Sequence, residues 1–497
     1  MRASRNILAV FQAGITQSLA LITLLCGSGY QEIQHPSILA DNDIWTHLSV
    51  GNWIIKNHAV PYTGVFSQSA DKPWSAYSWV FELLVSWFHS AGGLLGLMVF
   101  LIVLEVLVTW AIFHTLHRIS GSFWIAWGLT AAGIWAIYHT LPIRPVVFSV
   151  LFFTVVLHLI FAARRRASMR PLYWLLPLFV LWANIHIQFV YGLFLVGLFV
   201  GTRLMQALFE RLGWPWPEVD QEMNLPVMPL AAVGLGCIVA TMINPYGIRL
   251  FGEIAGYAQS KNVYAQISEL AALDFRDSAH FVQLLITAAA CFALGRKSKD
   301  PFKIALVLLT ALVGYRASRD SWFACIPALA IIASAFERES VDEESSRMSA
   351  HWLKTLGVAF GVVLALYAVL GNSTVDERSL QYSLAAITPV RAVEFIKKEK
   401  PPGPLYNGLN IGGFLMWHLP EYPVAMDGRT NLYGDETVNR FYNVLMLNAD
   451  PAKDEDLGQA NTVLMQKGYP LTMYLLQDRR FKLVYQDHNS CVFVKKQ

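Results

Sequence analysis

Long apolar segments separated by short polar loops fill most of the chain. A transmembrane helix needs about twenty mostly apolar residues, and the pattern predicts eleven such spans. They cover residues 6–28, 92–113, 122–141, 145–163, 171–183, 189–208, 229–243, 279–295, 301–315, 320–336 and 351–370. The pattern therefore predicts a mainly α-helical fold, a polytopic membrane bundle.

The pattern changes after residue 372, where short alternating runs replace the long apolar segments. We expect helices at 390–400, 435–446 and 471–477, and strands at 405–406, 424–426, 461–466, 481–485 and 491–494, the last two forming a hairpin. Of the 125 residues in 373–497, 28 are charged, against 45 in the first 372. The sequence predicts a membrane domain, 1–372, and a soluble α/β domain, 373–497.

Lys and Arg residues in short loops indicate the orientation of the membrane domain, because they concentrate on the cytoplasmic side. With a cytoplasmic N-terminus, 15 basic residues lie on the cytoplasmic side and 8 on the other. An odd number of spans then places the soluble domain and the first long loop, 29–91, outside. The net charge of +3, without a basic cluster interleaved with aromatics, excludes a nucleic-acid partner.

The unusual polar clusters all fall on this predicted outer side. They are 41–79, 138–145, 184–188, 244–277 and 315–320, whereas the inner loops are plain basic linkers. Polar groups at membrane depth usually line a cavity or pathway. We therefore expect one cavity that opens to the outer face and collects residues from these five clusters.

The first outer loop opens with two carboxylates, Asp41 and Asp43, ahead of an expected interfacial helix from Asp43 to Lys56. The pair could share a divalent cation, Mg²⁺ or Mn²⁺, through oxygen ligands. Either could instead be the general base for an acceptor hydroxyl, with His47 one helical turn from Asp43 on the same face. The alternative is structural, with Asp43 or Asn42 capping the helix.

Three arginines on the outer side are candidates for binding a phosphate. Arg144 lies between two prolines, and Arg316 and Arg319 lie in a tight turn between two apolar spans. The guanidinium group suits a phosphate by charge and by forked hydrogen bonds. Arg144 could instead reach the lipid headgroups, and Arg316 and Arg319 could pair with Asp320 or with phospholipid.

Two further pairs have a functional and a structural interpretation. Asn184 and His186 interrupt an apolar run, so they either line the site or satisfy hydrogen bonds inside the bundle. Asp427 and Arg429 follow an expected strand in the soluble domain, where they either bind a polar ligand or acceptor or form an ion pair in a tight turn. No phosphate-binding loop, nucleophile elbow or zinc motif occurs.

Several of these segments together resemble a bacterial group of multispan membrane proteins. Its pattern is roughly Asp-x-Trp-Trp-His-Leu, Gly, Pro, Phe-Ser, Pro-Trp and Trp-Leu-x-Glu. The matching residues are 43–48, with Thr46 in place of the second Trp, then 51–54, Pro61, 66–67, 73–74 and 79–82, followed by 144–145, 182–186, 244–247, 407–413, 427–429 and 432–434. The group is similar to the GT-C superfamily of membrane glycosyltransferases.

This resemblance implies a catalytic acidic residue in the first outer loop, matched by Asp43, with Asp41 beside it. It also implies a polyprenyl-phosphate sugar as donor, an outer soluble domain and a location in the bacterial inner membrane. We therefore expect transfer of a sugar from a lipid-linked donor to an outer glycan, lipid or protein acceptor. Two alternatives remain: a non-enzymatic membrane assembly protein whose soluble domain docks a partner, and a transporter of lipid-linked glycans.

Overall fold

The computed structural model describes residues 2–39, 41–217, 225–260, 268–337, 345–373 and 375–496. Residues 261–267, in the predicted outer loop 244–277, lie outside the described residues. The chain divides into two compact units. Unit 1 comprises Met1–His35, Val99–Asn244 and Glu269–Ser373, and unit 2 comprises Pro36–Met98, Pro245–Ser268 and Thr374–Gln497.

Unit 2 joins the C-terminal tail, residues 374–497, with two earlier segments of the chain. These are residues 36–98, which include most of the loop predicted as the first outer loop, and residues 245–268. A division from sequence alone takes the chain in consecutive pieces and cannot foresee this grouping. The predicted domain boundary after residue 372 stays a prediction.

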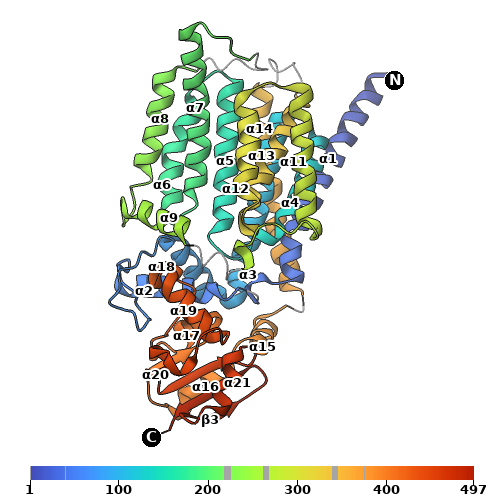
Figure 1. Cartoon of the computed structure of the whole chain (residues 1–497). Coiled ribbons are helices and arrows are strands. Elements are labelled where there is room, and N and C mark those ends of the chain that lie inside the picture. Colours follow the sequence, from blue (N-terminus) through green and yellow to red (C-terminus); the bar gives the residue numbers. More distant parts are fainter. Residues whose placement is uncertain are drawn as a thin grey trace. The chain divides into compact units, whose positions relative to one another are not determined.

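Unit 1 is a bundle of helices, with α13 (Trp322–Ser334) at its centre (Figure 1). The other helices are α1 (Arg2–Gln34), α4 (Phe123–Ile137), α5 (Val146–Arg165), α6 (Leu175–Ile185), α7 (Phe189–Leu212), α8 (Val227–Ala240), α11 (Ser278–Lys297), α12 (Pro301–Gly314) and α14 (Ser345–Gly371), with the part of α3 (Trp79–Ser120) after Met98. Helix α13 packs against α4, α11 and α12. It is apolar and buried on all sides, as expected of a helix inside a bundle.

The chain is mainly helical, and five of the described helices are long and apolar enough to cross a membrane. They are Trp79–Ser120, Val146–Arg165, Phe189–Leu212, Ser278–Arg296 and Trp352–Gly371, with two shorter apolar helices, Val227–Ala240 and Pro301–Gly314. The predicted number of eleven spans is not supported. Helices α4, α6 and α13 have only 15, 11 and 13 residues, fewer than the twenty or so that a perpendicular crossing needs.

In unit 2 the tail forms a small sheet (Figure 1). Its strand order is β1-β2-β4-β3. The strands are β1 (Leu405–Asn407), β2 (Thr462–Gln466), β3 (Phe481–Gln486) and β4 (Ser490–Lys495). Strands β1 and β2 are parallel, and the predicted final hairpin is confirmed as β3–β4. Helices α15 (Glu377–Ile387), α16 (Val390–Glu399), α19 (Asp435–Leu445) and α21 (Pro470–Gln477) accompany the sheet.

The predicted strand 424–426 is wrong. Val424 forms only an isolated bridge, and its partner is Ser67 in the first outer loop. The hydrogen bonds Val424 N–H to Phe66 O and Gln68 N–H to Val424 O complete this contact. Ser67 lies 357 residues before Val424 in the chain. The residues around Val424 therefore carry no local pattern that would distinguish an isolated bridge from a strand.

Helix α2 (Asp43–Asn57), predicted as Asp43–Lys56, packs against α17 (Gly412–His418) in the tail. The Trp45 ring lies edge-on to Phe414, with 5.5 Å between the ring centroids, and also contacts His418. A Cβ at Gly413 would lie 2.5 Å from the Thr46 hydroxyl oxygen. Only glycine therefore permits the two helices to approach this closely.

His418 makes this helix contact sensitive to pH. Burial, with smaller contributions from Lys397 and His89, lowers its pKa to about 4. The unfolded chain, with a pKa near 6.5, then takes up a proton that the folded protein does not. The free energy of unfolding should fall as the pH drops from about 6.5 to 4, by up to about 3 kcal/mol. Urea unfolding across this range, for wild type and His418→Phe, measures the difference.

The phenylalanine keeps the ring that packs on Phe414 and cannot titrate. It should therefore remove this part of the pH dependence. His488→Phe is the control, because His488 lies exposed in the β3–β4 turn. Parallel pH profiles for wild type and His418→Phe would show that His418 does not carry the effect.

Candidate functional site

Asp41 and Asp43 both lie at the start of α2 in unit 2. Asp41 is buried, and its Oδ1 accepts the backbone N–H of Asp43 at 3.0 Å. Asn42 makes no side-chain capping bond, so this contact to the helix comes from Asp41 and not from the two residues predicted as caps. Asp43 is half-buried, and its Oδ1 lies 2.6 Å from the position that a Cβ on Gly428 would take.

The predicted divalent cation at this pair stays a prediction. Among the described residues no group of three or more His, Cys, Asp or Glu side chains is arranged to hold a metal. Carboxylates from Asp41 and Asp43 alone would leave most ligands of a Mg²⁺ ion to water or substrate phosphate, which is common for this ion.

His47 contacts Glu82, a residue that the sequence patterns did not single out beyond the resemblance. His47 Nδ1 and Glu82 Oε1 are 3.4 Å apart, and the imidazole also meets the edge of the Phe81 ring. Glu82 is buried, with its Oε2 lacking a hydrogen-bond partner among the described atoms. A carboxyl group in this position orients the imidazole ring.

Unit 1 brings together residues from several of the predicted outer loops at one end of its helices. Arg144 forms an ion pair with Glu269 at 2.8 Å. Ser318 N–H donates to Ala271 O, and His280 Nε2 lies 3.2 Å from Ser318 Oγ. The loops 138–145, 269–278 and 315–320 thus form one connected polar region, which we call the unit 1 polar end.

Arg316 and Arg319 differ within this polar end. Arg319 lies 4.0 Å from the Asp320 carboxylate, which also accepts hydrogen bonds from Gln188 and Tyr191. Arg316 is exposed, and its guanidinium forms no ion pair with any described residue. The predicted alternative of pairing with Asp320 therefore applies to Arg319, whereas Arg316 is available to an anion.

The surroundings of Asn184 and His186 fit the structural interpretation. Asn184 Nδ2 donates to the carbonyl oxygens of Val180 and Ile243, which joins the ends of α6 and α8. His186 Nδ1 lies 2.8 Å from Ser149 Oγ, and the same oxygen accepts the Trp182 indole N–H. Both side chains hold the helices of unit 1 together.

Asp427 and Arg429 form a buried ion pair that fastens the tail to the first outer loop. Arg429 Nε and Nη2 donate to the two Asp427 oxygens at 2.9 and 2.8 Å, and Nη1 donates to Val65 O at 2.8 Å. The guanidinium also lies 4.7 Å from the Trp74 ring centroid. With these partners the pair fits the alternative of a turn with an internal ion pair, and we call it the Arg429 clasp.

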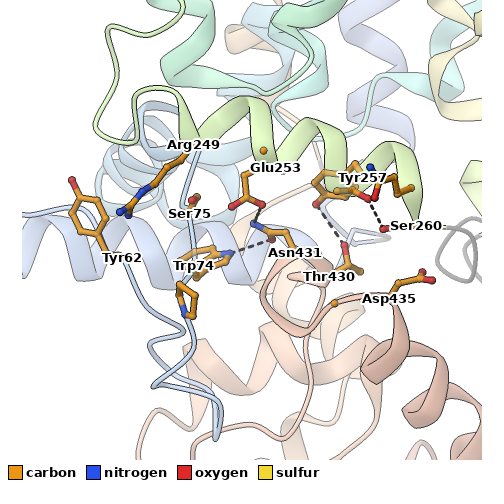
Figure 2. Close-up of a pocket in the computed structure, with 15 residues that line it drawn as sticks. Tyr62, Trp74, Ser75, Arg249, Glu253, Tyr257, Ser260, Thr430, Asn431 and Asp435 are labelled. Carbon is orange, nitrogen blue, oxygen red and sulfur yellow. Dashed lines mark hydrogen bonds between the residues drawn. The ribbon is translucent and has the colours of Figure 1, made fainter.

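A cavity of about 730 Å³ lies beside the clasp, entirely within unit 2. Its walls come from the first outer loop, from α9 (Arg249–Gln259) and from the tail residues that follow Arg429. Figure 2 shows a chain of hydrogen bonds across one wall, from the Trp74 indole to Asn431 Oδ1 and from Asn431 Nδ2 to Glu253. Cavities of this size are typical of small-molecule sites.

The cavity residues were missed because α9 was read as part of a loop. Its sequence carries Leu250, Phe251 and Ile254 at helical spacing, a signal that predicts a short amphipathic helix. Glu253 and Arg249 stand one turn apart on this helix. Asn431 follows Arg429 of the Asp-Gly-Arg segment by two residues. That motif therefore lies beside the loop that lines the cavity, although its sequence pattern did not indicate a cavity.

Comparison with models of known protein families found no match to this chain, and comparison with curated proteins found none either.

Proposed function

We propose that the protein is a membrane glycosyltransferase that moves a sugar from a polyprenyl-phosphate donor to an extracytoplasmic acceptor. The proposal takes the apolar helices as a GT-C-like bundle in a bacterial inner membrane, with a cytoplasmic N-terminus and an outer tail. The observation that carries it is the unit 1 polar end. Arg144 and Arg319 there have carboxylate partners, whereas the exposed Arg316 has none among the described residues, and an arginine beside apolar helices suits a lipid phosphate.

In this reaction Asp43 is the general base. It takes the proton of the acceptor hydroxyl while that oxygen attacks the anomeric carbon of the donor sugar. The bond from the anomeric carbon to the phosphate oxygen breaks, and its electron pair leaves with the lipid phosphate. A guanidinium group stabilises negative charge on a lipid phosphate, and the arginines that we propose for binding such a phosphate are Arg316, Arg144 and Arg319 of unit 1. The anomeric configuration inverts.

Turnover of polyprenyl-phosphate sugars by the purified protein and its Asp43→Asn variant tests the proposal. Loss of a general base should lower the rate by a factor of about 10²–10⁴. Asp71→Asn is a matched control, because Asp71 is an exposed carboxylate in the same outer loop, and it should retain full activity. Equal rates for wild type and Asp43→Asn would remove Asp43 from the chemistry.

One observation favours the non-enzymatic alternative, a membrane assembly protein. The Asp43 side chain lies against Gly428 of the tail, and the Asp43 N–H is held by Asp41. Such a carboxylate could serve only to join α2 to the tail. Under this alternative no lipid-linked sugar is turned over, and Asp43→Asn lowers the stability of unit 2 without changing any transfer rate.

A further inference from the structure

The cavity beside the Arg429 clasp combines the groups that recognise a polyhydroxylated ring. Arg249 at one end supplies guanidinium N–H donors and forms no ion pair with a described residue, and Figure 2 shows its guanidinium extending towards Tyr62. Glu253 supplies an acceptor carboxylate. Sugar hydroxyl groups both donate and accept, so a wall with each kind of group side by side suits them.

Aromatic side chains supply apolar faces in the same cavity. Tyr62 is 49% exposed at the edge of the cavity, and Trp74 is almost fully buried in its wall. Tyr257 contributes a ring whose hydroxyl is held by Tyr77 and Thr430. Rings with one polar end can cover the C–H face of a sugar while their polar atoms stay hydrogen-bonded.

The charges in the cavity argue against a simple anion. Besides Arg249, the lining contains two carboxylates, Glu253 and Asp435. A phosphate ion or a polyphosphate would meet repulsion from both. A saccharide can use the arginine and the carboxylates as hydrogen-bond partners without carrying a charge of its own.

The cavity is also close to Asp43, because the short segment 428–431 contacts Asp43 at one end and lines the cavity at the other. Gly428 contacts the Asp43 carboxylate, and Asn431, three residues later, lines the cavity. Three peptide units span at most about 11 Å between Cα atoms. A ligand in the cavity would therefore lie near the carboxylate proposed as the base.

We propose that this cavity binds the saccharide of the acceptor, with Glu253 and Arg249 contacting its hydroxyl groups and Tyr62 covering one face. This inference rests on the proposed transferase function, because it makes the cavity the acceptor part of that site. Neither Glu253 nor Arg249 is a catalytic residue in this assignment, since they select and position the acceptor.

Two glycines on α9 offer a direct test. Gly252 and Gly256 line the cavity, and a Cβ on either would meet no atom within 4 Å. Gly256→Leu should therefore fill part of the cavity without a clash, and leucine also favours a helix over glycine. Gly458→Leu is the matched control, because Gly458 also lies in a helix of unit 2 with free space around its Cβ position.

Binding to the purified full-length protein is measured with an N-acetylglucosamine disaccharide, a mannose disaccharide, glucuronic acid and inorganic phosphate, by tryptophan fluorescence or calorimetry. At least one saccharide should bind to wild type and to Gly458→Leu. Gly256→Leu and Glu253→Gln should each weaken that binding by about tenfold or more. Binding of phosphate alone, binding of no saccharide, or equal binding to wild type and Gly256→Leu overturns the inference.

The outcomes separate this inference from the proposed function. Saccharide binding that Gly256→Leu abolishes, in a protein that turns over no lipid-linked sugar, supports the cavity assignment and removes the transferase. Sugar transfer with an acceptor KM unchanged in Gly256→Leu supports the transferase and removes the cavity assignment.

Discussion

Replacing Arg429 by methionine should lower the free energy of unfolding of the protein by about 3–5 kcal/mol. The substitution leaves Asp427, which is fully buried, without its positive partner. It also removes the hydrogen bond to Val65 O and the contact with the Trp74 ring. Urea unfolding of the purified protein, with trypsin resistance of the tail as a second measurement, tests the prediction.

The chain contains its own control for this substitution. Asp478 and Arg480 repeat the Asp-x-Arg arrangement, with Arg480 N–H and side chain donating to Asp478, but Arg480 is 32% exposed. Arg480→Met should therefore change the free energy of unfolding by only about 0–1 kcal/mol. Equal decreases in the free energy of unfolding for the Arg429 and Arg480 variants would show that burial of the Arg429 clasp adds nothing to stability.

The clasp also has a defined pH dependence. Burial tends to raise the pKa of Asp427, but Arg429 and the Tyr433 hydroxyl outweigh it and hold the pKa below its ordinary value. The stabilisation is present above the unfolded pKa, near 3.9, and is lost as the pH falls through the lower folded value. Asp427→Asn combined with Arg429→Met should remove this acid-sensitive part and recover some of the stability lost in Arg429→Met.

Asp300→Asn should destabilise unit 1 by about 3 kcal/mol, through a different buried pair. The Asp300 carboxylate binds the Arg164 guanidinium, and the two side chains are only 1% and 2% exposed. Asp300 Oδ1 also accepts the Phe302 N–H at the start of α12, and asparagine can keep this cap. The loss therefore reports the charge pair, and thermal unfolding in detergent measures it.

A second variant separates the pair from the packing around it. Arg164 stacks on the Phe302 ring at 5.0 Å, so a methionine at this position keeps an apolar contact. Arg164→Met combined with Asp300→Asn should recover most of the lost stability, because no charge is left buried alone. Glu399→Ala, at an exposed ion pair with Lys398, should have almost no effect. A double variant no more stable than Asp300→Asn would contradict this explanation.

Local patterns predicted much of the secondary structure. Helix α2, helix α16 and the β3–β4 hairpin follow from apolar spacing and turn residues that neighbouring positions supply. The helices of unit 1 follow from apolar runs, but the span count does not, because helix ends depend on packing as much as on hydropathy. Helix α4, for example, has 15 residues, fewer than the predicted span 122–141 that contains it.

The sequence pattern could not predict the contacts between segments that lie far apart in the chain. The sequence Asp-Gly-Arg is compatible both with binding a ligand and with a hydrogen bond to Val65 O, and only the fold distinguishes these two roles. Glu253 gave no signal of its own, since its importance comes from Asn431, 178 positions later. By contrast, the meeting of loops 138–145, 269–278 and 315–320 was foreseeable, because an alternating topology brings every second loop to the same side.

The clasp also sets an order of events during synthesis. The hydrogen bond from Arg429 to Val65 O joins positions 364 residues apart. At about 5–20 residues per second, the ribosome adds Arg429 to the chain roughly 20–70 s after it adds Val65. During that interval the first outer loop, with Trp74 and Asp43, lacks the tail residues that it contacts in the folded protein. A chain interrupted before the tail would leave those residues uncovered, where a chaperone or protease could recognise them.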